Sequence, residues 1–144
     1  MRVRNILGEK GHEVVTVAPD TTVGDAVRLL ERERIGGLVV SPDGEHVEGI
    51  LSETDIVRGL ARDGPGLLDN QVSSLAVERP TLCSPDDEIR DVMAEMTRRR
   101  RRYVVAIADG RLAGIVSIGD VVKHELEDRE LEIRVLREIN LARG

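Results

Sequence analysis

Residues 34–57 read RIGGLVVSPDGEHVEGILSETDIV, two short apolar runs around an Asp-Gly turn, followed by a Ser-Glu-Thr-Asp segment. Residues 100–122, RRRYVVAIADGRLAGIVSIGDVV, have the same order. A shift of 66 residues, which sets Pro19 on Pro85, aligns the first runs and the two Asp-Gly pairs. The second runs align at a shift of 65, because the first copy has one extra residue after its turn. Self-similarity of this kind predicts a duplicated structural unit.

Each copy is expected to contain the elements β-α-β-β-α, which makes the fold class α/β, or more narrowly α+β. A short strand (14–17 or 81–83) stops at a proline, which cannot continue a ladder. The next helix has apolar residues at the i, i+3, i+4, i+7 spacing of one buried face. These residues are Val23, Ala26, Val27 and Leu30 in copy one and Ile89, Val92, Met93 and Met96 in copy two. A hairpin follows (38–40 with 47–51; 103–107 with 112–116), and a second helix begins near Thr54 or Gly119.

Composition favours a soluble chain with one shared core. The protein has 144 residues, 40% of them hydrophobic and 33% charged. The longest apolar stretches, 35–40 and 103–108, are far shorter than the ~20 residues that cross a bilayer. The N-terminus has no apolar run with a cleavage site, and Cys83 is the only cysteine, so no internal disulfide can form. We therefore expect a cytoplasmic protein that does not enter a membrane.

Charge and composition argue against nucleic acid as a partner. The formal net charge is −6, and Tyr103 is the only aromatic residue, so neither a general phosphate-neutralising surface nor a base-stacking platform is expected. The run Arg98–Arg102 is the local exception. It suits a phosphate or nucleic-acid patch, but cations at a helix C-terminus also complement the helix dipole, and consecutive residues point in different directions. The second interpretation is preferred.

Three stretches together resemble a CBS domain: 16–20 (TVAPD), 34–40 (RIGGLVV) and 49–57 (GILSETDIV). Copy two repeats the pattern more loosely, and the resemblance extends from residue 1 to about residue 125. It implies two CBS repeats packed with pseudo-two-fold symmetry as a Bateman module. Such a module is regulatory and binds adenosine-containing ligands, such as AMP, ADP, ATP or S-adenosylmethionine, in clefts between the repeats. The resemblance implies no required cofactor, only an adenine nucleotide as regulatory ligand.

Copy one carries the more complete set of candidate binding residues. An Asp in the first turn of a helix, here Asp55, can accept hydrogen bonds from both ribose hydroxyls, and the hydroxyl of Thr54 with nearby backbone N–H groups suits a phosphate. Residues near the strand entries could hold the adenine ring. These residues are Ile35, Gly36, Gly37, Val15 and Thr16. The same residues also fit plain roles as a helix cap, a turn and core packing, and both interpretations stay open.

Copy two differs at the matching positions. Gly119 replaces Thr54, whereas Asp120 keeps the ribose acceptor. Arg101, Arg102 and Tyr103 stand where copy one has Ile35, Gly36 and Gly37, and Thr81 opens the first strand of this copy. An arginine suits a phosphate reaching over from the other cleft, because its guanidinium can hold it bidentately. The two sites are therefore predicted to be unequal.

No catalytic or metal-binding constellation is found. Residues 49–52 lack the spacing of a nucleophile elbow, and the paired glycines at 44–49 and 114–119 are not followed by the lysine of a P-loop. The three histidines, His12, His46 and His124, are scattered, so we expect each on the surface and no metal site. The chain is predicted not to be an enzyme. A structural or interaction subunit without a small-molecule ligand is the alternative to a ligand sensor.

Residues 63–70, with Gly64, Pro65 and Gly66, are predicted as a linker between the copies. The predicted units are 1–66, the first repeat with its lead-in; 67–125, the second repeat; and 126–144, a helical extension. The lead-in residues 3–7 resemble 72–76. The extension carries an apolar stripe that either folds back on the module or joins a second copy: Leu131, Val135, Leu136 and Ile139. We favour a homodimer; no target protein is indicated.

Overall fold

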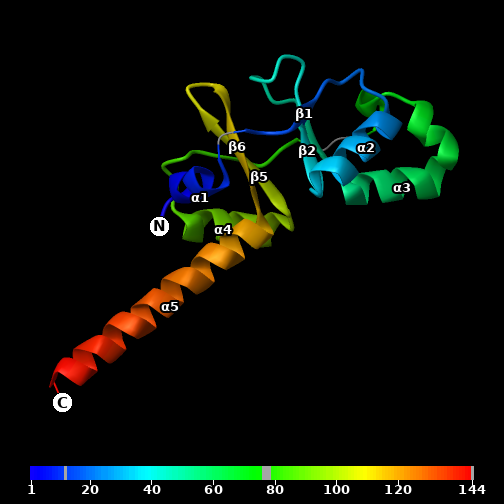
Figure 1. Ribbon diagram of the computed structural model, residues 1–144. Coiled ribbons are helices and arrows are strands. Elements are labelled where there is room, and N and C mark those ends of the chain that lie inside the picture. Colours follow the sequence, from blue (N-terminus) through cyan, green and yellow to red (C-terminus); the bar gives the residue numbers. More distant parts are fainter. Residues whose placement is uncertain (12, 76–78, 144) are drawn as a thin grey trace.

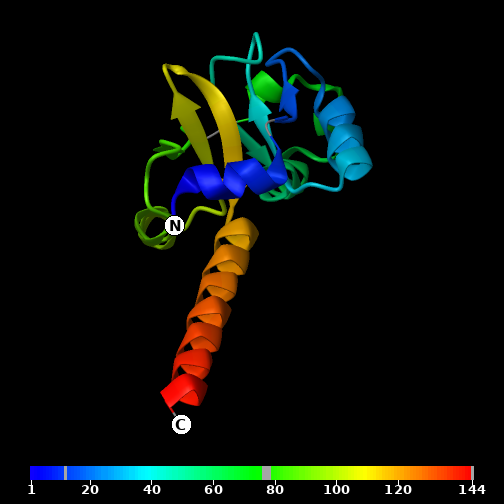
Figure 2. The same ribbon diagram turned by 60° about the vertical axis from the view of Figure 1, so that its left-hand side comes forward.

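The computed structural model describes residues 1–11, 13–75 and 79–143. His12 and Ala76, which entered the predictions above, lie outside the described residues. Two small α+β units sit side by side, and one long helix extends away from them (Figures 1 and 2). This mixed fold with two three-stranded sheets confirms the predicted fold class.

The two repeats have the same order of elements and the same sheet topology. The first contains β1 (Thr16–Val17), α2 (Val23–Glu33), β2 (Gly37–Val40), β3 (Gly49–Ser52) and α3 (Glu53–Asp63). The second contains β4 (Leu82–Cys83), α4 (Ile89–Arg99), β5 (Tyr103–Ala108), β6 (Arg111–Ser117) and α5 (Ile118–Arg143). In each sheet the first strand is parallel to the second, which pairs antiparallel with the third. The duplication predicted from the sequence is therefore present in the backbone.

The first helix of each repeat ends in the same way. Arg34 and Arg100, which the 66-residue shift relates, both adopt left-handed backbone conformation, with φ of 52° and 54°. Their N–H groups donate to carbonyls of the last helical turn, which satisfies groups that the helix end leaves open. The chain then turns directly into β2 or β5. The strand entries that were predicted to hold a ligand are positioned by this cap.

The N-terminal helix α1 (Val3–Lys10) packs on the second repeat, although chain order assigned it to the first. Val3, Ile6 and Leu7 are buried in a core with residues of α4, β5 and β6. The Val3 N–H donates to the carbonyl of Asp87 (2.9 Å), and the Arg4 N–H donates to that of Pro85 (2.9 Å). Burial of three aliphatic side chains therefore joins α1 to the second unit.

The segment before the second repeat makes the matching contacts with the first. It forms two short 3-10 helices, η1 (Pro65–Asp69) and η2 (Val72–Ser74). The Val72 N–H donates to the carbonyl of Thr21 (2.7 Å), and the Ser73 N–H donates to that of Pro19 (2.9 Å). Thr21 and Pro19 correspond to Asp87 and Pro85 under the 66-residue shift. Each lead-in segment therefore packs on the other repeat, and the two make equivalent contacts, as pseudo-two-fold symmetry requires.

Residues 63–70, predicted as a linker, are part of the folded structure. Leu67 is 1% exposed and belongs to the first core, together with Val72 and Leu75. Gly64 has a φ of +74°, which glycine adopts without strain, and Pro65 begins η1. The Gly-Pro-Gly composition therefore reflects a tight change of direction between α3 and η1.

The last helix, α5, continues for 26 residues from Ile118 to Arg143 and does not fold back on the module (Figure 1). Only its start is packed, with Val121 and His124 as its buried residues. From Arg129 to Arg143 every side chain is exposed, which leaves the apolar stripe without cover in the single chain. In the described ranges, none of the helices is both long and apolar enough to cross a membrane.

Candidate functional site

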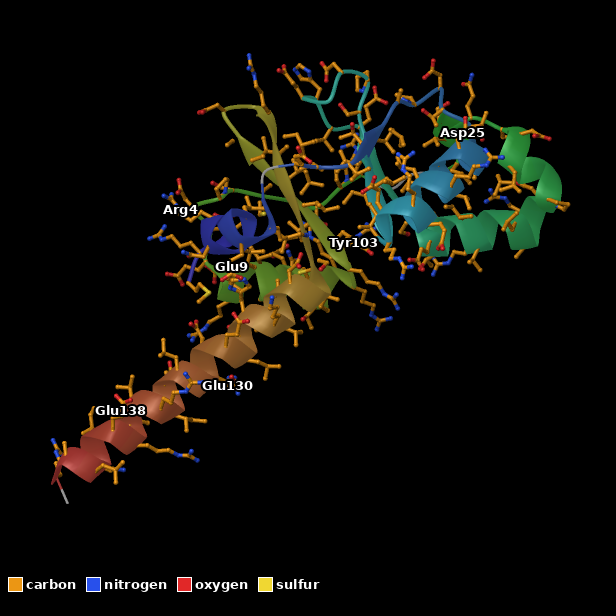
Figure 3. The ribbon with its side chains drawn as sticks, viewed as in Figure 1. Arg4, Glu9, Asp25, Tyr103, Glu130 and Glu138 are labelled. Carbon is orange, nitrogen blue, oxygen red and sulfur yellow. The ribbon has the colours of Figure 1, made fainter. Side chains whose placement is uncertain are left out.

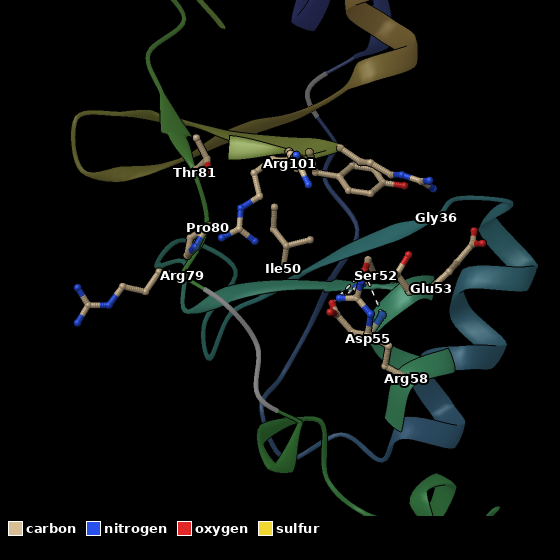
Figure 4. A pocket seen from close by; sticks show the side chains of 14 residues that line it. Gly36, Ile50, Ser52, Glu53, Asp55, Arg58, Arg79, Pro80, Thr81 and Arg101 are labelled. Atoms are coloured by element: carbon tan, nitrogen blue, oxygen red, sulfur yellow. Dashed lines mark hydrogen bonds between the residues drawn. The ribbon is translucent and has the colours of Figure 1, made fainter. Parts of the chain in front are cut away.

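A pocket of about 300 Å³ lies between the two repeats (Figure 4). Its first wall is the end of β3 and the start of α3, residues 52–55, with Gly36, Ile50 and Arg58. Its second wall comes from the second repeat, through residues 79–81 and 100–103. The pocket therefore joins a helix N-terminus of one repeat to the strand entries of the other.

The start of α3 is held by a reciprocal cap. Ser52 Oγ accepts from the Asp55 N–H (3.3 Å), while the Ser52 N–H and hydroxyl both donate to Asp55 Oδ2 (2.9 Å each). The Glu53 N–H donates to the carbonyl of Gly36 (3.0 Å), which fixes the helix against β2. Among the described residues, Asp55 Oδ1 has no hydrogen-bond donor. The capping role is thus real, and one carboxylate oxygen remains available to a ligand.

Basic side chains dominate the pocket. Two carboxylates, Glu53 and Asp55, face a larger set of cations from both repeats. These cations are Arg58, Arg79, Arg100, Arg101 and Arg102. Within the described ranges, Arg58, Arg100 and Arg102 have no carboxylate within 4.0 Å. On a chain of net charge −6, this is a local positive site suited to an anion.

The arginine run divides between two roles. Arg98 and Arg99 form ion pairs with Glu95, at 2.6 Å and 2.9 Å, on the surface of α4. Residues 100–102 line the pocket instead. The run therefore does not form one continuous basic surface. This agrees with the expectation that consecutive side chains point in different directions.

Tyr103 fills the space beside the Gly36–Gly37 pair. A Cβ added at Gly36 would collide with the Tyr103 hydroxyl, and one at Gly37 would lie 3.1–3.3 Å from ring carbons. Burial raises the pKa of Tyr103, and the charge of Glu53 adds to that increase. The glycines therefore permit close contact between the strand entries of the two repeats.

The structure divides the predicted site residues into two groups. Those that line the pocket are Gly36, Thr54, Asp55, Thr81, Arg101, Arg102 and Tyr103. The others lie elsewhere: Val15 and Ile35 pack against the first core, Thr16 pairs with Val39, Gly37 begins β2, and Gly119 and Asp120 lie at the start of α5. The pocket is built by both copies, and within it the residues of the copy-one set are joined by arginines of copy two.

Several lining residues were missed by sequence reasoning. Arg58 could have been found, because it follows Asp55 by three residues and so lies on the same helix face. Arg79 had no such signal, since only the path of the chain between the repeats brings it to this pocket.

The start of α5 repeats the cap of α3 but has an additional partner. Ser117 and Asp120 exchange hydrogen bonds, with the Ser117 N–H 2.9 Å from Asp120 Oδ2. Lys10 Nζ, from the end of α1, lies 2.7 Å from the same oxygen and 3.1 Å from the carbonyl of Ile115. Burial raises the pKa of Asp120, but the hydrogen bonds from Lys10 and Ser117 outweigh it and lower the pKa overall. The two equivalent carboxylates therefore have different surroundings.

His124 is buried, which corrects the prediction of a surface residue. It is 4% exposed, with Nε2 3.1 Å from Glu9 Oε2 and Nδ1 3.1 Å from Met1 Sδ. The physical reason is the exchange of α1 onto the second repeat, which covers this face of α5. His46 is exposed beside Asp43, as predicted for a surface histidine.

Duplicated β-α-β-β-α units, related by a pseudo-two-fold axis and sharing a pocket, define a tandem two-repeat module. The family model of the CBS domain matches this chain twice, over residues 4–62 and 72–127. The chain therefore belongs to the CBS domain family.

Individual relatives agree with this assignment. A mitochondrial CBS domain-containing protein of Arabidopsis thaliana, CBSX3, is 32% identical over 81% of this chain, which spans 59% of that protein's length. The crystal structure of a CBS-domain protein from Agrobacterium tumefaciens is 38% identical, with a TM-score of 0.82, over 87% of this chain and 99% of that one. A CBS domain protein from Pyrobaculum aerophilum, solved in complex with AMP, shares the fold at 24% identity, with a TM-score of 0.73, over 83% of this chain and 89% of that one.

Proposed function

We propose that this protein is a non-enzymatic regulator that binds an adenine nucleotide in the pocket between its CBS repeats. The observation that carries the proposal is the meeting of the α3 N-terminus with arginines of the second repeat in one pocket. The ribose would lie on Asp55 and the phosphate among Arg100–Arg102 and Arg58. The AMP complex of the Pyrobaculum relative is consistent with this class of ligand.

Electrostatics favour a phosphate over an uncharged or cationic ligand. Guanidinium groups hold phosphate through charge-assisted, often bidentate hydrogen bonds, and a helix N-terminus adds a favourable dipole. S-adenosylmethionine has no phosphate and carries a sulfonium charge, so the cations of this pocket would oppose it. Among the candidate ligands, the proposal therefore favours AMP, ADP or ATP.

The dimensions of the pocket favour a mononucleotide. About 300 Å³ is at the lower end of the range of small-molecule pockets, which runs from about 300 to 1,000 Å³. Ile50, Pro80 and the half-buried Tyr103 supply the apolar surface on which an adenine ring could pack. A dinucleotide such as NAD would need space beyond this pocket.

We expect AMP to stabilise the protein against heat, whereas NAD and S-adenosylmethionine do not. Ligand at 100 times its dissociation constant stabilises the folded state by about 2.7 kcal/mol, which raises the melting temperature of a chain of this size by about 5–10 °C. A thermal-shift series with AMP, ADP, ATP, NAD and S-adenosylmethionine measures this. No shift with any of them would favour the alternative, a structural subunit without a small-molecule ligand.

Lys10→Ala is expected to add a second AMP site to the one in the wild type. Lys10 Nζ lies 2.7 Å from Asp120, and its removal frees the carboxylate that corresponds to Asp55. The stoichiometry from isothermal titration calorimetry checks the change. Arg4→Ala, which breaks the ion pair of Arg4 with Asp86 on the same helix, is the control and should leave one site. One site in both variants would show that Lys10 does not close the second cleft.

We further propose that two copies associate through α5, and that the dimer regulates a target protein in the cytoplasm. The exposed stripe supports association, because aliphatic side chains on a projecting helix gain most when they are covered. Its members are 44–60% exposed: Leu131, Val135, Leu136 and Ile139. Residues 129–143 contribute nothing to either core, so their removal should leave the module folded.

A chain truncated after Glu127 is expected to be monomeric, while the full chain is dimeric. Light scattering at matched concentrations measures both masses, and far-UV circular dichroism confirms that the truncated module keeps its fold. A dimer that survives truncation would rule out α5 as the cause of association.

A further inference from the structure

One group of potential metal ligands lies away from the nucleotide pocket, where α1 meets α5. It consists of Glu9 on α1 with His124 and Glu127 on α5, and its ligand atoms all lie within 4.8 Å of one another. His124 is buried, while Glu9 and Glu127 are exposed at the rim. Figure 3 shows Glu9 beside the packed start of α5. The group therefore combines an imidazole fixed by packing with two carboxylates that solvent and ions can reach.

We propose that Glu9, His124 and Glu127 bind a divalent transition-metal cation, with water in the remaining positions. Two ligands at about 2.1 Å from one cation are separated by about 3.0–3.4 Å in octahedral or tetrahedral geometry. His124 Nε2 and Glu9 Oε2 are 3.1 Å apart, so both can reach one cation without moving apart. Glu127, one helical turn after His124, supplies the third ligand atom from the same side of α5.

The other ring nitrogen of His124 supports this assignment. Nδ1 lies 3.1 Å from Met1 Sδ and Nε2 lies 3.1 Å from Glu9 Oε2, and a thioether and a carboxylate both act only as acceptors. A cation that takes the place of a proton on Nε2 leaves the Nδ1–H directed at the sulfur and turns the Nε2 lone pair to the metal. Metal-bound histidines in proteins are oriented in the same way, by a hydrogen bond from the second nitrogen.

The surroundings add a favourable field for a cation. A hollow between the start of α4 and α5 adjoins His124. Its lining has four acidic residues, Glu88, Glu125, Asp128 and Glu132, against three cationic groups, those of Arg90, Arg129 and the Met1 α-ammonium. An excess of negative charge raises the local concentration of cations. One imidazole with carboxylates suits Zn²⁺ or a neighbouring transition metal, whereas Mg²⁺ prefers oxygen ligands alone.

Binding at this place would tie the first helix of the chain to the last. Glu9 directly precedes Lys10, whose side chain contacts Asp120, so the cation would also hold α1 where Lys10 meets the start of α5. The site does not use any residue of the nucleotide pocket. Its existence is therefore independent of the proposed function.

Titration with Zn²⁺ tests the proposal by calorimetry and by thermal unfolding. All proteins carry His12→Ala and His46→Ala, which remove the other two histidines of the sequence. The parent should bind one Zn²⁺ per chain and melt at a higher temperature when it is bound. Glu127→Gln should weaken binding at least tenfold, because it removes one charged ligand at an exposed position. Glu130→Gln makes the same charge change further along α5 and should bind as the parent does (Figure 3).

Three results would overturn the proposal. Absence of Zn²⁺ binding by the parent would show that His124 and Glu9 form an ion pair only. Equal affinity in the parent and Glu127→Gln would place the metal elsewhere. Displacement of Zn²⁺ by an equal concentration of Mg²⁺ would contradict the choice of a transition metal.

Discussion

Asp55→Ala is expected to lower the affinity for AMP by about 30- to 100-fold, while Asp120→Ala leaves it within about twofold. Each hydrogen bond to a charged acceptor contributes about 1.5–3 kcal/mol, and the Asp55 carboxylate would accept from the ribose hydroxyls in the proposed complex. Asp120 is paired with Lys10 at the start of α5 and does not line the pocket. Isothermal titration calorimetry with AMP measures both variants.

Asp120→Ala is also the structural control for Asp55→Ala. Each aspartate accepts a hydrogen bond from the N–H of the serine three residues earlier, Ser52 or Ser117, at 2.9 Å. Loss of a helix cap costs about 1 kcal/mol in either variant, so the cap loss is matched, and the control additionally loses the contact of Asp120 with Lys10. Equal loss of affinity in both would contradict the inequality of the sites. Unchanged affinity in both would show that the ribose does not lie on Asp55.

Ile6→Ala should reduce the free energy of unfolding by about 2–4 kcal/mol. Ile6 is 1% exposed in the core of the second repeat, and a large-to-small change at such a position loses burial and leaves a cavity. Urea denaturation measures the change. Ile133→Ala is the matched control, because Ile133 is 51% exposed on α5, and its effect should stay within about 0.5 kcal/mol.

The same variant tests where α1 packs. Hydrogen exchange in Ile6→Ala should accelerate in α4 and β6, whose residues share the core with Ile6, and much less in α2. Faster exchange in α2 and β1 instead would mean that α1 packs on the first repeat, as the order along the chain suggested. The conclusion that each lead-in segment packs on the other repeat would then be wrong.

Elements and topology could be read from the sequence, because they follow from local patterns. The stripe in residues 23–30 has one apolar face whatever surrounds it, and that face forms the first core in α2. Asp109 and Gly110 both have positive φ, which is the conformation that a tight Asp-Gly turn requires. In copy one the prediction of a tight Asp-Gly turn was wrong, because Val40 pairs with Gly49 and residues 41–48 form a longer loop in which Gly44, but not Asp43, has positive φ.

The candidate site could be predicted only in part. Thr54 and Asp55 lie at a helix start, which local sequence indicates, and Arg101 and Arg102, which comparison of the copies suggested as ligand residues, line the same pocket. Which of the predicted residues share one pocket could not be predicted, because the pocket joins residues about 50 positions apart in the sequence. The glycine pair at 36–37, which was predicted to lie beside a ligand, also receives the ring of Tyr103, and Gly36 lines the pocket.

By itself, then, the sequence determined a duplicated α+β unit, its helix and strand positions, and the acidic and basic groups at its helix starts. Only the tertiary structure decided that α1 covers the second repeat, that Lys10 contacts Asp120, and that His124 is buried beside Glu9. The physical reason is the distance along the chain over which each interaction acts. Periodicity and capping act within a few residues, whereas these contacts depend on two amphipathic segments, α1 and η2, each finding a lower free energy on the opposite repeat.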